Sequence, residues 1–179
     1  HCLGSGLIMQ FNVPASSGGC ALNNPPIADQ FPITSTTGLN AGVGADWGVL
    51  TTGNNNLGQS IYQRYGVLWR VAPLPAPNGS VSSFWGYGAD LTCVRNQTQQ
   101  LSPGSIIGVG GTNYEFNNDV RGGNSGSGLV VNNQLVGVVT HCSNACVNYG
   151  TRADRSDFRA ARDNVCPRAW QLTVQSSPS

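Results

Sequence analysis

Short apolar or alternating runs, separated by turn residues, recur along most of the chain. Four such runs have the length and the β-branched or aromatic content that strands favour: residues 48–50, 67–71, 81–86 and 105–109. The clearest element is a predicted hairpin, in which the runs 128–131 and 135–140 flank the turn 132–134. An Asn-rich turn between two β-branched runs is typical of a tight hairpin. Many short strands at fairly regular spacing predict an all-β barrel or sandwich.

One helix is expected, near the C-terminus. Ser156 is a candidate N-cap for a helix over residues 157–162, and Pro167 follows soon after. The Pro-rich segment 73–77 is a stiff connector and indicates a boundary between two halves of the fold. Residues 175–179 are expected to be a flexible tail.

Composition narrows the classes of function. Of the 179 residues, 39% are hydrophobic and only 9% are charged, which excludes the composition of a disordered chain and fits one domain. The formal net charge is +1, so nucleic-acid binding through phosphate contacts is not expected. No apolar run reaches the ~20 residues of a membrane span. We expect a soluble protein, a monomer, with neither nucleic-acid nor membrane partners.

The chain contains 24 Gly and six Cys, and all nine of its basic residues are Arg. A turn-rich chain with six Cys fits an oxidising compartment better than the cytosol, so we expect secretion to an extracellular or periplasmic space. Six cysteines allow fifteen pairings, and sequence alone does not choose among them.

The segment 122–128, Gly-Gly-Asn-Ser-Gly-Ser-Gly, precedes the predicted hairpin. A Ser between glycines on a tight turn suits a nucleophile, because small neighbours leave room for a substrate carbonyl. Small residues also let two backbone N–H groups, those of Gly123 and Ser125, point at one developing oxyanion. In a Gly-rich chain such a turn is more often only a turn.

A Ser nucleophile needs a base and an orienting carboxylate. The chain has two His residues, His1 and His141, and Asp46 opens an apolar strand. The order His1, Asp46, Ser125 is that of the chymotrypsin class of triad and differs from the subtilisin and α/β-hydrolase orders. His1 and Asp46 are 45 positions apart, the same separation as between the base and the acid of chymotrypsin.

These residues resemble the motifs of trypsin-like (chymotrypsin-fold) serine peptidases, and most of all secreted bacterial members related to glutamyl endopeptidases. His1-Cys2 is similar to the end of the family's Thr-Ala-Ala-His-Cys motif, and residues 46–50 to its Asp-led strand. Residues 123–128 resemble its Gly-Asp-Ser-Gly-Gly-Pro motif in the bacterial Gly-Asn-Ser-Gly-Ser form. Residues 134–140 resemble the strand that lines its substrate cleft. The resemblance covers most of residues 1–151.

The resemblance implies two antiparallel six-stranded Greek-key barrels, with sub-barrels at about 1–72 and 78–155 of a domain spanning 1–174 and a short C-terminal helix. The first barrel is expected to be incomplete, because the family has strands before its catalytic His. A chain truncated at His1 is expected to show little turnover, since the base would lie at a fraying terminus. In the family the Cys after the His pairs with an upstream Cys. Cys20 is the nearest substitute for it here, and Cys142 and Cys146 are expected to close a small loop.

The implied activity is that of a serine endopeptidase, a hydrolase that acts on protein or peptide substrates and needs no cofactor or metal. Ser125 is the implied nucleophile, His1 the base and Asp46 the carboxylate that orients His1, with the amides of Gly123 and Ser125 as the oxyanion hole. In most eukaryotic trypsins an Asp precedes the nucleophile and pairs with the amino terminus released on activation. The residue here is Asn124, so a switch of that type is not expected.

Four further residues are candidates for substrate binding. Asp119 lies six positions before Ser125, where trypsins carry the carboxylate that selects Arg or Lys, although Arg121 is near enough in sequence to neutralise it. Glutamyl-specific members use a His at the position of Val139, so specificity for Glu is not expected. Thr140 continues the cleft strand, and His141 follows it either as a hydrogen-bonded loop residue or as a contact to substrate.

Two other functions remain open. A mature chain that begins with His resembles secreted copper-dependent polysaccharide monooxygenases, which bind copper through the amino group and imidazole of His1 and through a second His, here His141. This alternative does not account for the motifs at Ser125 and Asp46, which would then be coincidences. The third possibility is an inactive peptidase-like binding module, although all three triad residue types are present.

Overall fold

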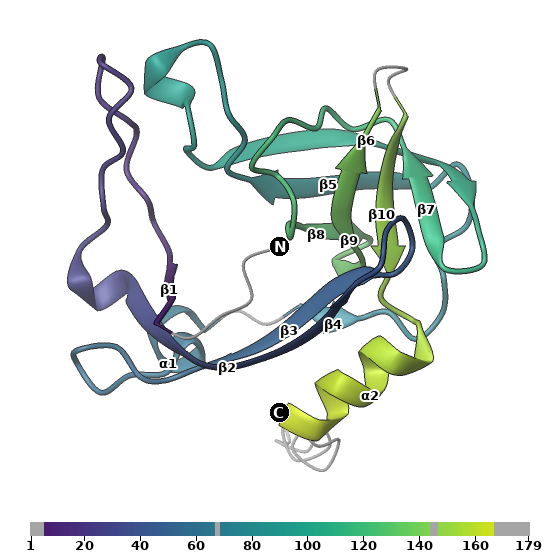
Figure 1. Cartoon of the computed structure of the whole chain (residues 1–179), viewed down its shortest axis with the longest axis horizontal. Coiled ribbons are helices and arrows are strands. Elements are labelled where there is room, and N and C mark those ends of the chain that lie inside the picture. The colour runs from purple at the N-terminus through teal and green to yellow at the C-terminus, as the bar shows by residue number, and fades with distance from the viewer. Residues whose placement is uncertain (1–5, 67–68, 144–146, 167–179) are drawn as a thin grey trace, which may run out of the picture.

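The computed structural model describes residues 6–66, 69–143 and 147–166. The N-terminal part forms a three-stranded antiparallel sheet with the order β1-β2-β3, in which β1 is Ile8–Gln10, β2 is Gln30–Asn40 and β3 is Asp46–Thr52. Figure 1 shows this sheet below the rest of the molecule, with helix α2 (Ser156–Val165) against it. The expected strand at residues 48–50 is confirmed as the middle of β3.

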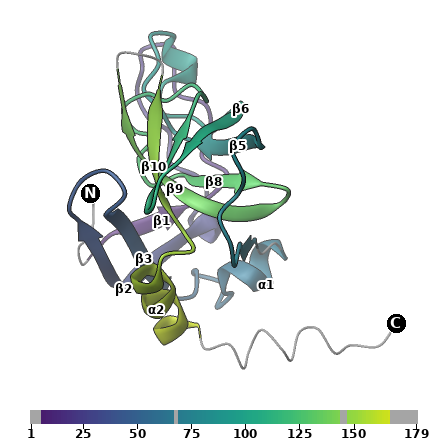
Figure 2. The same cartoon turned by 90° about the vertical axis from the view of Figure 1, so that its right-hand side faces the viewer.

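The C-terminal part is a seven-stranded sheet. Its members are β4 (Arg70–Val71), β5 (Val81–Gly86), β6 (Gln100–Val109), β7 (Asn113–Phe116), β8 (Gly128–Val131), β9 (Gln134–Cys142) and β10 (Asn148–Arg152). Strand β10 pairs with both β7 and β9, which closes β5 to β10 into a six-stranded barrel, and β4 joins β9 from outside in parallel. Figure 2 shows the barrel standing above the first sheet and the two helices. The all-β prediction is confirmed.

The predicted hairpin is strands β8 and β9. Its turn is shorter than expected, because Gln134 already belongs to β9 and pairs with Val131. Asn132 and Asn133 both have positive φ, 49° and 59°, a conformation that Asn tolerates and that two-residue hairpin turns require. The sequence pattern therefore predicted the hairpin and missed its turn length by one residue.

The barrel interior is filled by apolar side chains from most of its strands. Six of them have no exposed surface: Phe84, Ile106, Tyr114, Phe116, Leu129 and Val139. Tyr114 is the one with a polar end, and its hydroxyl accepts a hydrogen bond from the Ala76 N–H in the Pro-rich connector, with N and O 2.7 Å apart. The connector is thereby fixed to the barrel core.

A second cluster joins the two sheets through helix α2. The Trp47 ring meets Phe158 edge to face, with ring centroids 5.7 Å apart, and buried Ala153 packs beside them. The helix begins one residue earlier than a Ser156 cap implies, because Arg155 is the N-cap, and Arg155 makes no side-chain capping bond. The Arg155 guanidinium pairs instead with Asp157 and holds the pKa of that carboxyl down, at about 2.

Helix α1 (Ile61–Tyr65) was not expected from the sequence. It carries a complete capping box, in which Ser60 and Gln63 bond each other's backbone N–H, and it ends at Gly66 with φ of 66°. Ser-x-x-Gln followed by Gly is a recognisable start and stop signal, so this short helix was predictable. Two single-turn 3-10 helices complete the elements, η1 (Ile27–Asp29) and η2 (Cys93–Arg95). No helix among the described residues is long and apolar enough to cross a membrane.

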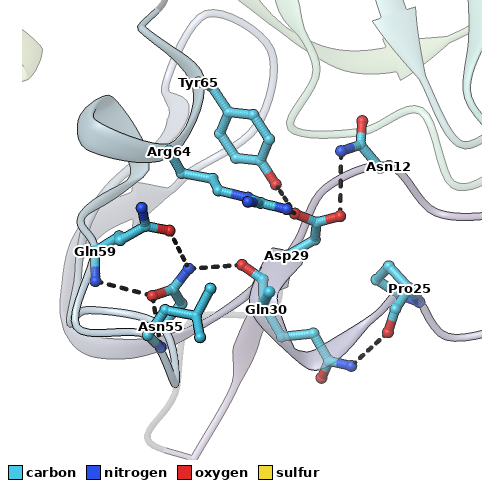
Figure 3. Close-up of polar contacts among 10 residues, drawn as sticks. Asn12, Pro25, Asp29, Gln30, Asn55, Gln59, Arg64 and Tyr65 are labelled. Atoms are coloured by element: carbon cyan, nitrogen blue, oxygen red, sulfur yellow. Dashed lines mark hydrogen bonds and ion pairs between the residues drawn. The ribbon is translucent and has the colours of Figure 1, made fainter.

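Asp29 anchors a polar cluster at one edge of the first sheet (Figure 3). Its carboxylate accepts hydrogen bonds from the Tyr65 hydroxyl at 2.8 Å, the Arg64 guanidinium at 3.0 Å and the Asn12 amide at 3.2 Å. These donors, Tyr65 and Asn12 foremost, lower the pKa of Asp29, whereas burial and the Asp29 charge raise the pKa of Tyr65 to about 12. The cluster ties both ends of the segment 12–29 to helix α1.

The segment 12–29 forms a long loop that reaches the barrel. Its Cys20 forms a disulfide with Cys93 in the loop between β5 and β6, and Figure 1 shows the two loops side by side at the upper left. This pairing corrects the expectation that Cys20 substitutes as the partner of Cys2, because the loop extends away from the first sheet. Cys142 is an exposed free thiol; its expected partner Cys146, like Cys2, lies outside the described residues.

Candidate active site

Ser125 lies on the loop that leads into β8, and its side chain is exposed. The loop is closed by its own backbone, because the Asn124 N–H donates to the Arg121 carbonyl at 3.0 Å and the Ser127 N–H donates to the Asn124 carbonyl at 3.1 Å. The Gly126 N–H then bonds the Val139 carbonyl at 2.8 Å, which fixes the loop to β9. Ser125 therefore sits at the tip of a rigid turn, as a nucleophile requires.

The backbone N–H groups of Gly123 and Ser125 donate no hydrogen bond within the described part of the chain. Gly123 has φ of 99°, in the region that favours glycine, and a Cβ at this position would lie 2.7 Å from the Tyr87 carbonyl oxygen. Only Gly fits this conformation and this contact. The loop thus holds two unused donors on either side of Asn124, next to the Ser125 hydroxyl.

The side chain of Asn124 is buried, with 6% of its surface exposed. Its Oδ1 accepts from the Arg121 N–H at 3.2 Å. Together with the bond from the Asn124 N–H to the Arg121 carbonyl, this makes a reciprocal pair of hydrogen bonds. The amide packs against the backbone at Gly86 and Gly88, where a Cβ would lie 2.3 Å and 2.1 Å from its atoms. The loop is held here by local amide contacts, without an ion pair at Asn124.

The Ser125 hydroxyl donates to the Thr140 carbonyl on β9, with oxygens 3.2 Å apart. Thr140 is the extra residue of a bulge, because Val139 pairs with Gly150 and His141 pairs with Tyr149, the next residue along β10. Its own hydroxyl bonds the Tyr149 carbonyl at 3.2 Å. Bulges re-aim backbone groups and are common next to active sites, and this bulge lies where β9 meets the Ser125 loop.

Asp46, the first residue of β3, is buried, with 6% of its surface exposed. Its backbone N–H donates to the Thr151 hydroxyl on β10 at 3.2 Å. Thr151 pairs with Val138 in the β9–β10 ladder, two positions before Thr140. Asp46 lies in the first sheet and Ser125 on the loop before β8, and both are attached to the same short stretch of this ladder.

Asp119 is exposed at the rim of a cavity of about 280 Å³, which is also lined by Asp90, Arg121 and Asn124. The Asp119 carbonyl accepts from the Ser102 hydroxyl at 2.9 Å. No ion pair joins Asp119 to Arg121 among the described residues.

Val139 and His141 differ in exposure. Val139 has no exposed surface and packs in the barrel core, and its N–H and carbonyl bond Ser127 and Gly126. Its backbone therefore holds the Ser125 loop, and its expected part in substrate binding stays a prediction. His141 is partly exposed on the same strand, one residue beyond the bulge.

His1 lies outside the described residues, so its expected position beside Asp46 stays a prediction, as does the copper site built on His1 and His141. Within residues 6–66, 69–143 and 147–166, no group of three or more His, Cys, Asp or Glu could hold a metal ion. The buried residue Asn118 was not singled out in the sequence. Its side chain bonds Ser82 on β5 and Ser102 on β6, and its carbonyl accepts from Asn148 on β10.

Comparison with solved structures identifies the fold. A Glu endopeptidase matches with a TM-score of 0.65 and 18% identity, over 87% of this chain and 82% of that one. The Rv3671c protease in its inactive form matches with a TM-score of 0.51 and 17% identity, over 77% and 68%. Human heparin binding protein matches with a TM-score of 0.52 and 13% identity, over 84% and 68%. No protein-family model and no curated protein matches the chain.

The chain therefore has a trypsin-like, chymotrypsin-type fold, shared with serine peptidases at low sequence identity. One protein of this fold is named for binding heparin and two for proteolysis, so function has to be inferred from the site.

Proposed function

We propose that this protein is a secreted serine endopeptidase, which hydrolyses peptide bonds through a triad of His1, Asp46 and Ser125. The Ser125 Oγ attacks the peptide carbonyl carbon, and His1 takes the hydroxyl proton. The C–N bond then breaks as His1 passes that proton to the leaving amine, which leaves an acyl-enzyme on Ser125. Water, activated by His1, hydrolyses this ester and restores the Ser125 hydroxyl.

Other groups of the site have defined roles in this scheme. The negative oxygen of the tetrahedral intermediate lies between the N–H groups of Gly123 and Ser125, where fixed donors stabilise developing charge best. Asp46 fixes the tautomer of His1 and stabilises its cation. The Thr140 carbonyl, which accepts from Ser125 in the free protein, holds the hydroxyl in place until substrate binds.

The observation that carries the proposal is the pair of unused amides beside Ser125. Two backbone donors that have no acceptor among the described residues lie on a tight turn beside an exposed Ser hydroxyl, and this supports an anion site where an oxyanion would develop. The buried carboxylate of Asp46 is attached to the same β9–β10 ladder, and the fold is shared with serine peptidases.

A serine-directed phosphonate tests the proposal. The reagent should form a bond from phosphorus to the Ser125 Oγ with loss of its leaving group, and mass spectrometry of the full natural protein should locate the adduct there. Ser125→Ala should abolish labelling and lower kcat for peptide hydrolysis about 10⁴- to 10⁶-fold. Ser127→Ala, two residues away on the same loop, is the matched control and should keep both the labelling of Ser125 and the kcat for peptide hydrolysis. Labelling that survives Ser125→Ala would contradict the proposal.

The same preparation separates the other two functions. A copper monooxygenase should contain stoichiometric copper on His1 and His141, lose it on His141→Ala and show no adduct at Ser125. An inactive binding module should show neither copper nor an adduct, and should leave a peptide library uncut.

Specificity for the residue before the scissile bond is proposed to depend on Asp119 and His141, which flank Ser125 on the 119–124 segment and on β9. Cleavage rates of peptides that differ only in having Arg, Glu or Leu at that residue discriminate between the roles of Asp119 and His141. A preference for Arg that is lost in Asp119→Asn assigns the role to Asp119, and a preference lost only in His141→Ala assigns it to His141. Secretion is proposed from the Cys20–Cys93 disulfide, because such bonds persist in oxidising compartments.

A further inference from the structure

A second cavity, of about 410 Å³, opens beside Gly123 in the Ser125 loop. Its walls come from both halves of the molecule. The loop 12–29 contributes Val13 and Leu22, and the barrel contributes Tyr87, Gln97 and Gly123. Gly123 also supplies one of the two unused amides, so the cavity begins at the proposed oxyanion site.

The lining of this cavity carries no charged side chain among the residues described. Apolar groups, such as the half-exposed Leu22, alternate with neutral amides such as Asn23 and Gln97. Burial raises the pKa of Tyr87, which keeps its phenol neutral and able to donate. Burial of a charged group here would remove it from water without a partner of opposite charge, and that is costly.

The wall formed by the loop 12–29 is fixed at both ends. At the tip, the Cys20–Cys93 disulfide and a 2.6 Å hydrogen bond from the Ser16 hydroxyl to the Asn96 carbonyl attach it to the barrel. At the base, Asp29 binds Asn12 and the residues of helix α1. The cavity is therefore preformed, which reduces the entropy lost when a ligand binds.

The two sides of Ser125 determine which part of a peptide reaches this cavity. Strand β9 lies on one side and bonds the loop through Val139 and Thr140. The segment at Tyr87 lies on the other side, behind Gly123. In the proposed reaction, a peptide that binds with its acyl half along β9 would cross Ser125 and place its leaving half over Gly123, toward the cavity.

We propose that this cavity is the subsite for the first residues after the scissile bond and that it selects uncharged side chains there. This inference rests on the proposed peptidase function. The loop 12–29, held by its disulfide, is thus a determinant of specificity for the leaving group, separate from Asp119 and His141 on the acyl side.

Aminolysis of the acyl-enzyme measures binding on the leaving-group side of Ser125 alone. An ester substrate acylates Ser125, and an added amino-acid amide then competes with water: its nitrogen attacks the ester carbonyl, the bond to Ser125 Oγ breaks, and the amine proton passes through His1 to that oxygen. The amides of Leu and Gln should capture the acyl group about 10-fold more efficiently than those of Asp and Arg. Equal capture of neutral and charged amides would overturn the subsite.

A matched pair of variants locates the effect. Leu22→Asp places a carboxylate on the wall and should shift capture about 10-fold toward the Arg amide. Leu57→Asp changes a Leu of nearly equal exposure, 58% against 56%, on a turn that does not line the cavity, and should leave the capture ratios unchanged. An unchanged ratio in Leu22→Asp would contradict the proposal. If the ester gives no acyl-enzyme at all, the peptidase function itself fails, and the subsite with it.

Discussion

The backbone N–H of Asp46 donates to the hydroxyl of Thr151, a residue 105 positions later in the chain, with N and O 3.2 Å apart. Thr151 has 1% of its surface exposed. This single bond joins the first sheet to strand β10 at the residue proposed to orient the catalytic base. The position of the Asp46 carboxylate therefore depends on a side chain with no expected part in the chemistry.

Thr151→Val should separate this positioning role from packing. Val has the same shape and no hydroxyl, so the buried Asp46 N–H loses its acceptor, at a cost of about 1–3 kcal/mol in the free energy of unfolding. Displacement of Asp46 should also lower kcat, by about 100-fold. Thr151→Ser keeps the hydroxyl and should keep most of the activity. Equal losses of kcat in the two variants would show that the Thr151 hydroxyl does not position Asp46.

Gly123→Ala should damage the proposed oxyanion site. The new Cβ would lie 2.7 Å from the Tyr87 carbonyl, in a backbone conformation that favours Gly, so the loop must shift and carry its amide away. We expect kcat to fall about 10²- to 10³-fold with little change in KM. Gly122→Ala is the control, since its Cβ meets nothing within 4 Å. Steady-state kinetics on one peptide substrate measures both variants, and comparable losses would argue against the assigned amide.

Asn118→Ala should destabilise the barrel behind the nucleophile loop. Its fully buried amide bonds Ser82 and Ser102, and truncation leaves two buried carbonyls and one hydroxyl short of a partner. The expected loss is about 3 kcal/mol in the free energy of unfolding, measured with denaturant. The neighbouring Asn117 is exposed and accepts one bond, from the Ser105 N–H, so Asn117→Ala should cost about 1 kcal/mol.

The Asp29 cluster should make stability depend on pH at both extremes. Asp29 has a lowered pKa in the folded protein, so its contribution is complete above its unfolded pKa of ~3.9 and is lost as pH falls through the folded value. The stability difference between the native protein and Asp29→Asn should therefore shrink in acid. A difference that stays constant from pH 6 to pH 2 would contradict this.

Tyr65 should make the free energy of unfolding depend on pH at the alkaline extreme. Its pKa is raised to about 12, so the neutral phenol contributes fully below the unfolded pKa of ~10, and that contribution is lost as pH rises toward 12. Tyr65→Phe should remove this alkaline dependence in denaturant unfolding curves. Tyr62→Phe, half-exposed on the same helix, should leave it in place.

The parts of the fold that follow from neighbouring residues were predictable from the sequence. The hairpin at 128–140, the strand after Asp46 and the Gly-rich turn around Ser125 each depend on local propensity and turn chemistry, and each lies where the pattern indicated. Helix α1 also carried a local signal in Ser60, Gln63 and Gly66.

Contacts between distant segments were not predictable in the same way. The Cys20–Cys93 disulfide depends on how far the loop 12–29 extends, and the register shift at Thr140 depends on β10, so neither leaves a mark in the local sequence. The burial of Val139 was not predictable for the same reason. Side chains alternate between the two faces of a strand, and the bulge at Thr140 determines which of them point outward. The position of His1 relative to Asp46 is still a prediction.

The Cys20–Cys93 disulfide also determines how the molecule would respond to a cut. The connector 73–77 lies between the two cysteines, so cleavage of that segment by a protease would leave two fragments that stay covalently joined. The nicked protein should migrate as one band in a non-reducing gel and as two bands after reduction. The protein would thereby survive a break in that segment of its backbone as a single covalent molecule.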